Sequence, residues 1–119
     1  AFNAEDLGFA AQRRLYEDIA AIGEHKIAVI DSADIRANPE AVLCALCDAI
    51  DLPFDPAMLN WPAGGHPDDG PWAPHWYPAV WSSTGFAGAE GPLPDVDPGL
   101  RAVFDAALPF YNRLAEVKL

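Results

Sequence analysis

The sequence predicts an α/β fold, mostly helical as it stands, with one clear buried strand at 26–32. Two observations lead to this class. Apolar residues recur at helical spacing over 4–22 and again after Asp97 and Pro98, whereas "KIAVIDS" is a short continuous apolar run. Such a run is typical of a strand that is covered on both faces, as in a parallel sheet. With 119 residues, the chain forms one domain at most.

The first helix is expected over 4–22, because its apolar side chains lie on one stripe and its charged ones lie mostly off it. Asn3 is placed to cap this helix, and Gly23 follows its last residue. The stripe consists of Leu7, Ala11, Leu15, Ile19 and Ile22.

The strand, from Lys26 to Ser32, has no neighbour of comparable strength in the chain. Because one strand cannot form a sheet, we interpret 1–119 as a single partial domain whose missing strands precede Ala1. An initial alanine in place of methionine points the same way, to a processed or trimmed chain or a fragment. We expect the unpaired strand to promote self-association.

Three Asn-Pro or Asp-Pro pairs predict the starts of the remaining helices: Asn38–Pro39, Asp55–Pro56 and Asp97–Pro98. In each pair the first side chain can cap the helix, and proline suits the first helical position. The first of these helices should end before Pro53. The last contains Pro109, which is expected to kink it.

The segment 60–96 is predicted to be a long aromatic loop. Its part "WPAGGHPDDGPWAPHWYPAVWSSTGF" holds all four tryptophans, and its glycines and prolines exclude a regular helix or a central strand. Long ordered loops without regular structure are usually functional. We expect the tryptophans to hold this loop in place.

The formal charge of −11 excludes nucleic acid and anionic membranes as general partners. No Lys or Arg occurs between Ala37 and Leu100, so an anion bound there would need backbone N–H groups, histidine or another part of a larger protein. The apolar runs are too short to span a membrane. Cys44 and Cys47 lie three apart on a predicted helix, where we expect free thiols and hence a cytoplasmic location.

His66, Asp68, Asp69 and His75 are residue types that bind zinc or manganese. The stretch "GGHPDDG" is, however, also typical of a turn, in which Gly, Pro and Asp serve the backbone geometry. We therefore expect no metal site.

The block "VIDSADIRANPEAVLCALCDAIDLPFDPAML" resembles the C-terminal half of P-loop sulfotransferases, where an acidic loop leads to a helix opened by "D-P-E" and then to a "P-F" turn. The matching residues are Asp34, Pro39, Glu40, Leu43, Leu46, Cys47, Leu52, Pro53, Phe54, Met58 and Leu59. Asn38 replaces the usual aspartate as an equivalent cap, and Asp51 stands where glycine is usual. The aromatic block that follows is similar to a bacterial branch of sulfotransferase-like proteins.

The resemblance covers most of the chain and implies a P-loop NTPase-like parallel-sheet fold. It also implies transfer of a sulfuryl group from 3'-phosphoadenosine 5'-phosphosulfate to a small-molecule alcohol or amine. The glycine-rich, lysine-containing donor loop of the family is absent here, as is its late "R-K-G" motif. We therefore expect the isolated chain to be inactive without a longer parent, and its status as an enzyme stays open.

Within the loop, Ser82, Ser83, Thr84 and Gly85 lie near the place expected for cofactor contacts and could supply hydroxyl and N–H donors. Trp72, Trp76 and Tyr77 could line an acceptor pocket, with His75 as general base. These aromatic residues could instead form a structural lid.

A reading from a different class is also open. The chain could be a complete, non-enzymatic helical binding or interaction module, which would melt cooperatively as a monomer or dimer.

Overall fold

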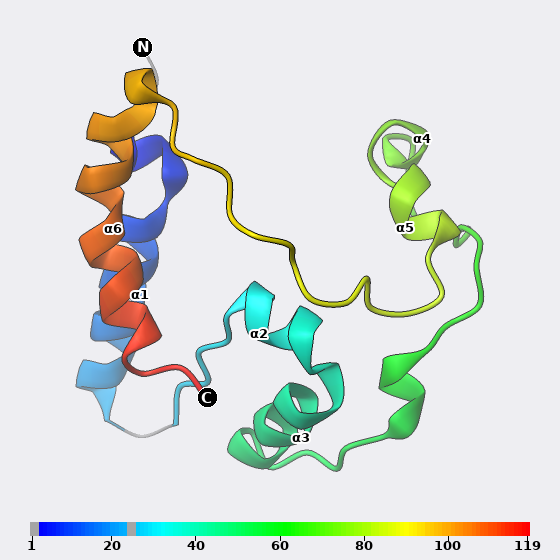
Figure 1. Ribbon diagram of the computed structural model, residues 1–119. Coiled ribbons are helices and arrows are strands. Elements are labelled where there is room, and N and C mark those ends of the chain that lie inside the picture. Colours follow the sequence, from blue (N-terminus) through cyan, green and yellow to red (C-terminus); the bar gives the residue numbers. More distant parts are fainter. Residues whose placement is uncertain (1–2, 24–25) are drawn as a thin grey trace.

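The computed structural model describes residues 3–23 and 26–119 (Figure 1). All regular elements in these ranges are helices, and their β pairing is confined to one isolated bridge between Asn60 and Gly85. In chain order the elements are η1 (Ala4–Leu7), α1 (Phe9–Ile22), α2 (Ser32–Ala37), α3 (Pro39–Ala49), η2 (Pro56–Leu59), α4 (Ala73–Trp76), α5 (Pro78–Ser82), η3 (Pro98–Leu100) and α6 (Arg101–Ala115).

The first predicted helix is present in two pieces, η1 and α1. The Asn3 side chain accepts hydrogen bonds from the N–H groups of Glu5 and Asp6, as a capping residue should. Gly8 then adopts φ +77°, a left-handed conformation that ends the 3-10 turn and precedes α1. Gly23 ends α1 in the same conformation, as expected.

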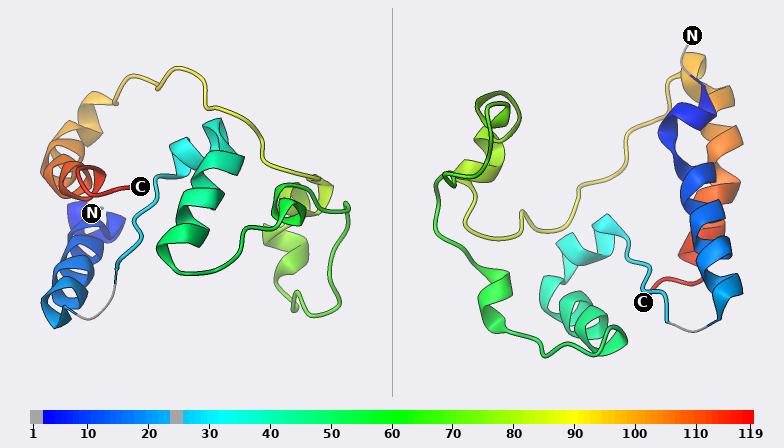
Figure 2. Two further views of the ribbon diagram at one scale, coloured as in Figure 1. Left: turned by 90° about the horizontal axis from the view of Figure 1, so that it is seen from below. Right: turned by 180° about the vertical axis from the view of Figure 1, so that it is seen from behind.

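The helices α1 and α6 lie side by side and run in the same direction, with their N-terminal ends toward the same end of the molecule (Figures 1 and 2). The Phe9 and Tyr111 rings meet edge to face, with 6.0 Å between their centroids. The Arg13 guanidinium lies 5.3 Å from the centroid of the Phe110 ring. The contact between α1 and α6 therefore brings the N-terminal and C-terminal parts of the chain together.

The prediction of an α/β, P-loop NTPase-like parallel-sheet fold is wrong for the described residues. Residues 26–31 form no strand, and 32 begins α2. The apolar run matches a strand in composition, but a strand needs a neighbour with which to form a ladder of hydrogen bonds. Among the described residues, one distant group bonds to the backbone of 26–31: the N–H of Leu119 donates to the Val29 carbonyl at 3.0 Å. Asp31 serves instead as a helix cap that accepts the N–H of Ala33 at 2.9 Å.

The three predicted helix starts are confirmed. Asn38 accepts the N–H of Ala41, Asp55 that of Ala57, and Asp97 that of Gly99, and proline follows each cap. The helix α3 carries Cys44 and Cys47, both free thiols. Pro109 lies inside α6.

Asp51, just after α3, adopts φ +56°. This left-handed conformation favours glycine, because a Cβ atom crowds the backbone there. This conformation gives a physical reason why glycine is usual at this position in the family that the sequence resembles.

The expectation of a loop without helices over 60–96 was too strict, because α4 and α5 lie within it. Each is a single turn that has proline in one of its first two positions. Proline lacks an N–H group that the first turn would leave unbonded in any case, so it tolerates a short helix that it would break from inside.

The chain follows an open arc, from the α1–α6 pair through α2 and α3 to α4 and α5 (Figure 2). Its radius of gyration is 17.3 Å, whereas about 13.5 Å is typical of a compact domain of this length. Its accessible surface is 8977 Å², against about 6300 Å² for a compact chain of this mass. Among the described residues, only Cys47, Ala73 and Ala107 are buried. No helix in this part of the chain is both long and apolar enough to cross a bilayer.

Candidate functional site

The base of the aromatic loop is held closed by Trp61. Its backbone N–H donates to the Thr84 carbonyl at 3.2 Å, next to the Asn60–Gly85 bridge. Its indole N–H donates to the Ser83 hydroxyl at 3.0 Å, and its ring meets Phe86 edge to face. Hydrogen bonds and ring packing therefore fix the residues on both sides of α4 and α5.

A second brace forms around Trp81. Its indole N–H donates to Asp69 Oδ2 at 2.8 Å, and its carbonyl accepts the N–H of Gly64 at 2.8 Å. A Cβ atom on Gly65 would lie 2.8 Å from the Trp81 ring, so the chain passes close to the indole here. The hydrogen bond from the His66 backbone N–H, and to a smaller extent the one from the Trp81 indole, lowers the pKa of Asp69 below its ordinary value.

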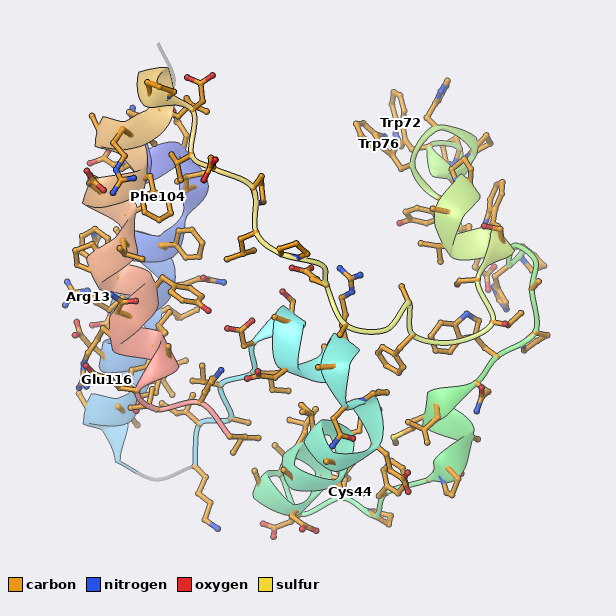
Figure 3. All side chains as sticks on the ribbon, in the orientation of Figure 1. Arg13, Cys44, Trp72, Trp76, Phe104 and Glu116 are labelled. Carbon is orange, nitrogen blue, oxygen red and sulfur yellow. The ribbon has the colours of Figure 1, made fainter. Side chains whose placement is uncertain are left out.

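The other two tryptophans do not hold the loop. Trp72 is 71% exposed and Trp76 is 75% exposed. The N–H of Trp76 bonds to the carbonyl of Trp72, one helical turn earlier, so both indoles lie on one face of α4. Figure 3 shows the two labelled side chains at the end of the arc farthest from α6. The expectation that tryptophans hold the loop thus applies to Trp61 and Trp81 only.

The predicted cofactor residues Ser82, Ser83, Thr84 and Gly85 all line one open cavity of about 740 Å³. The N-terminal end of α3, from Asn38 to Glu40, lines its other side. The structure thus brings the serine-rich turn and a helix N-terminus together. A helix N-terminus presents backbone N–H groups and partial positive charge.

Two of the hydroxyl groups in this cavity already donate hydrogen bonds to the protein backbone. The Ser82 hydroxyl donates to the Ala79 carbonyl at 3.0 Å, and the Ser83 hydroxyl donates to the Val80 carbonyl at 2.7 Å. Within the described residues, the Thr84 hydroxyl makes no hydrogen bond. Of the three predicted hydroxyls, that of Thr84 is therefore the one with a proton to offer a ligand.

Arg36 is a charged residue near this cavity that the sequence reasoning did not select. It directly precedes Ala37, which lines the cavity, and its Nε donates to the Gly88 carbonyl at 3.1 Å. Its Nη1 pairs with Glu90 at 2.5 Å. A signal was present in the sequence, because Arg36 is the last cation before the long cation-free segment.

The sulfuryl donor that the resemblance implies, 3'-phosphoadenosine 5'-phosphosulfate, carries a phosphate and a phosphosulfate group. One hydroxyl, one helix end and Arg36, which is already paired with Glu90, are few donors for so much negative charge. Glu40 adds a carboxylate to the lining. These residues by themselves do not fit the sulfuryl donor.

The two described histidines have different surroundings. His66 Nδ1 accepts the N–H of Asp68 at 3.2 Å, so the neutral ring carries its proton on Nε2 and offers a donor. The His75 side chain is exposed and makes no hydrogen bond with the described residues. Tyr77 and His66 line a cavity of about 360 Å³ with Asp69 and Trp81, and His75 is not among the residues that line it.

In the part of the chain that the structure describes, no group of three or more His, Cys, Asp or Glu side chains is arranged to hold a metal ion. The Asp69 carboxylate accepts hydrogen bonds from the His66 N–H and the Trp81 indole, whereas the Asp68 side chain is 91% exposed and lies 3.4 Å from His66 Nδ1. The hydrogen bonds of Asp69 fit the interpretation of "GGHPDDG" as a turn.

Fold and site together describe an open helical domain with a braced aromatic loop beside a serine-lined cavity. The family model of the sulfotransferase domain matches residues 2–117. The chain therefore belongs to the sulfotransferase-domain family.

Curated relatives add a second finding. The chain is 38% identical over 114 residues to branched-chain-amino-acid aminotransferase-like protein 1 of Arabidopsis thaliana, which covers 92% of this chain and 20% of that protein. It is 37% identical over 110 residues to the corresponding protein 2, with 92% and 19% covered. The chain thus spans about a fifth of the length of these plant proteins. No solved structure matches it.

Proposed function

We propose that this chain is the acceptor-side part of a longer cytoplasmic sulfotransferase, in which other residues bind 3'-phosphoadenosine 5'-phosphosulfate. The observation that supports this activity is the chain's membership of the sulfotransferase-domain family. The poor fit of the Ser82–Gly85 cavity to a polyanionic donor, with Arg36 as its neighbouring cation, supports a donor site completed from elsewhere. By itself the chain does not transfer a sulfuryl group.

The large exposed surface also supports the proposal that this chain is one part of a longer protein. A chain with an area well above that of a compact domain gains stability when further protein covers its apolar side chains. The relatives are about five times as long, so the rest of a longer polypeptide is a natural source of that cover. We propose that the same additional protein supplies the missing cations.

The acceptor, a small molecule or a group carried on a larger one, lies on the aromatic part of the loop in this proposal. Trp72, Trp76 and Tyr77 make its apolar contacts, and His75 takes the proton that the acceptor hydroxyl or amine loses. Both ring nitrogens of His75 are free of described protein partners, so one can accept a proton. His66 already uses Nδ1 as an acceptor and is less suited to the role.

Calorimetry with 3'-phosphoadenosine 5'-phosphosulfate tests the division of labour. We expect no micromolar binding by the isolated chain and clear binding by a longer protein that contains it. Micromolar binding by the isolated chain would contradict the claim that the donor site lies elsewhere. If the longer protein binds donor but transfers sulfuryl to none of a panel of alcohols and amines, the proposed activity fails.

A further inference from the structure

Trp72, the N-cap of α4, and Trp76, its last residue, present two largely exposed indoles on one side of a single helical turn. Neither residue lines the cavity at Ser82–Gly85 or the one at His66 and Tyr77. Their high exposure makes this face an open platform. Exposed tryptophans gathered in this way are common at the centres of protein interfaces, and small-molecule sites are usually concave.

The segment of the chain that carries this face is acidic. The segment between Ala37 and Leu100 contains nine carboxylates and no Lys or Arg. Among the described residues, Glu90 is the one carboxylate of that segment in an ion pair with an arginine or lysine, namely Arg36. Asp68, four residues before Trp72, is exposed. The segment therefore keeps most of its negative charge.

Indole faces attract cations, and tryptophan does so more strongly than tyrosine or phenylalanine. An unbalanced negative field adds long-range attraction for a positive partner and repels anions. We infer that the acceptor lying on Trp72 and Trp76 is a basic polypeptide segment, whose Arg or Lys side chains stack on the two indoles. The inference rests on the proposed function in placing the acceptor on this face, and it adds the acceptor's chemistry.

Binding can be measured on the whole chain without any sulfuryl donor. The probe is a ten-residue peptide of alternating arginine and glycine, with an alternating glutamate and glycine peptide as its control. We expect the arginine peptide to bind at low salt and the glutamate peptide not to bind. Combined Trp72→Ala and Trp76→Ala substitution should weaken arginine-peptide binding by about tenfold, if each indole contributes a typical exposed cation–π contact.

Leu93→Ala is the matched control, because Leu93 is 84% exposed in the same cation-free segment and has no aromatic ring. It should change the affinity by less than about twofold, as expected for a surface change away from the contact. The double tryptophan variant must keep the parent's circular dichroism and melting temperature. It is expected to do so, because both indoles are mostly exposed.

Three results would overturn the inference: no binding of the arginine peptide, equal binding by parent and double variant, or tryptophan-dependent binding to anionic phosphatidylserine vesicles. The second would mean that the overall charge alone attracts the peptide. The third would mean that the face binds a membrane. A longer protein that transfers sulfuryl to neutral acceptors only, while the arginine peptide fails to bind, would leave the proposed function intact and remove this inference.

Discussion

Trp81 donates its indole N–H to the carboxylate of Asp69 across twelve residues of the aromatic loop, at 2.8 Å. The same oxygen accepts the backbone N–H of His66 at 2.7 Å, so one carboxylate ties the turn before α4 to the helix α5 that follows it. The geometry of the candidate site depends on this small polar junction.

Acidification should open the Trp81–Asp69 junction. Because the folded-state pKa of Asp69 is lowered, its stabilising contribution is present above the ordinary pKa of about 4 and is lost as pH falls through the lower folded value. We expect the near-ultraviolet circular dichroism of the tryptophans to change below about pH 4.

Two variants identify the source of that change. Trp81→Phe should abolish it, whereas Trp61→Phe should retain it, because the indole of Trp61 bonds to the Ser83 hydroxyl, which does not titrate. An unchanged acid transition in Trp81→Phe would assign the signal to another group.

Gly65→Ala should destabilise the loop, because the new Cβ would lie 2.8 Å from the Trp81 ring. Overpacking of this kind costs about 1–3 kcal/mol. Gly91→Ala is the control, since nothing lies within 4 Å of a Cβ atom there. Urea unfolding monitored by tryptophan fluorescence compares the two, and equal midpoints would show that Gly65 can move away from the ring.

Asp51→Gly should stabilise the chain. Asp51 holds φ +56°, where a residue with a Cβ atom is strained, and glycine relieves that strain at some cost in unfolded-state entropy. The expected gain is about 0.5–1 kcal/mol. Asp48→Gly, inside α3, should instead destabilise by about 0.3 kcal/mol, the difference in helix propensity. Thermal melting measures both, and a lower melting temperature for Asp51→Gly would refute the strain argument.

Local signals in the sequence predicted the helices well, because each cap acts within four residues of the chain. Asn38, Asp55 and Asp97 bond to N–H groups two or three positions ahead. The strand at 26–32 could not be settled in this way, since pairing depends on a second segment whose presence no local pattern reports. Its apolar composition was real, but the neighbour was missing.

The parts of the candidate site that depend on contacts between distant residues could likewise not be predicted from the sequence. That the serine-rich turn would line a cavity with the start of α3 was not foreseeable, because the Asn60–Gly85 bridge that closes the loop joins residues 25 positions apart. The position of Arg36 depends on Gly88 and Glu90, which lie more than 50 residues away. The different roles of the four tryptophans likewise depend on partners that composition does not identify.

The extended residues 26–31 give a prediction about assembly. Their apolar side chains line a groove of about 530 Å³ with α1 and α6, and the backbone of Ala28 makes no hydrogen bond with described residues. Unpaired backbone groups beside apolar surface favour strand addition from a second copy. Sedimentation velocity should therefore show an average mass that rises with concentration.

Ala28→Pro and Ala28→Ser test whether backbone pairing causes that association. Proline removes the N–H donor, while serine keeps it at the same position. The proline variant should stay monomeric where the serine variant and the parent associate. Association that survives in the proline variant would place the contact on another surface.

The last prediction concerns the choice between His75 and His66 as the general base in a longer, active protein. An acceptor hydroxyl must lose a proton as the new S–O bond forms, and the base needs a free nitrogen lone pair to take it. His66 spends Nδ1 on the N–H of Asp68, so its neutral ring offers only the Nε2 proton. His75 has no such bond with the described residues and stands in sequence between the two exposed residues Trp72 and Trp76. We expect His75→Ala to lower kcat by about 10²-fold with little change in donor affinity, and His66→Ala to change it by less than about threefold. If the two variants behave alike, or if His75→Ala lowers only the melting temperature, then His75 is structural and the base lies outside this chain.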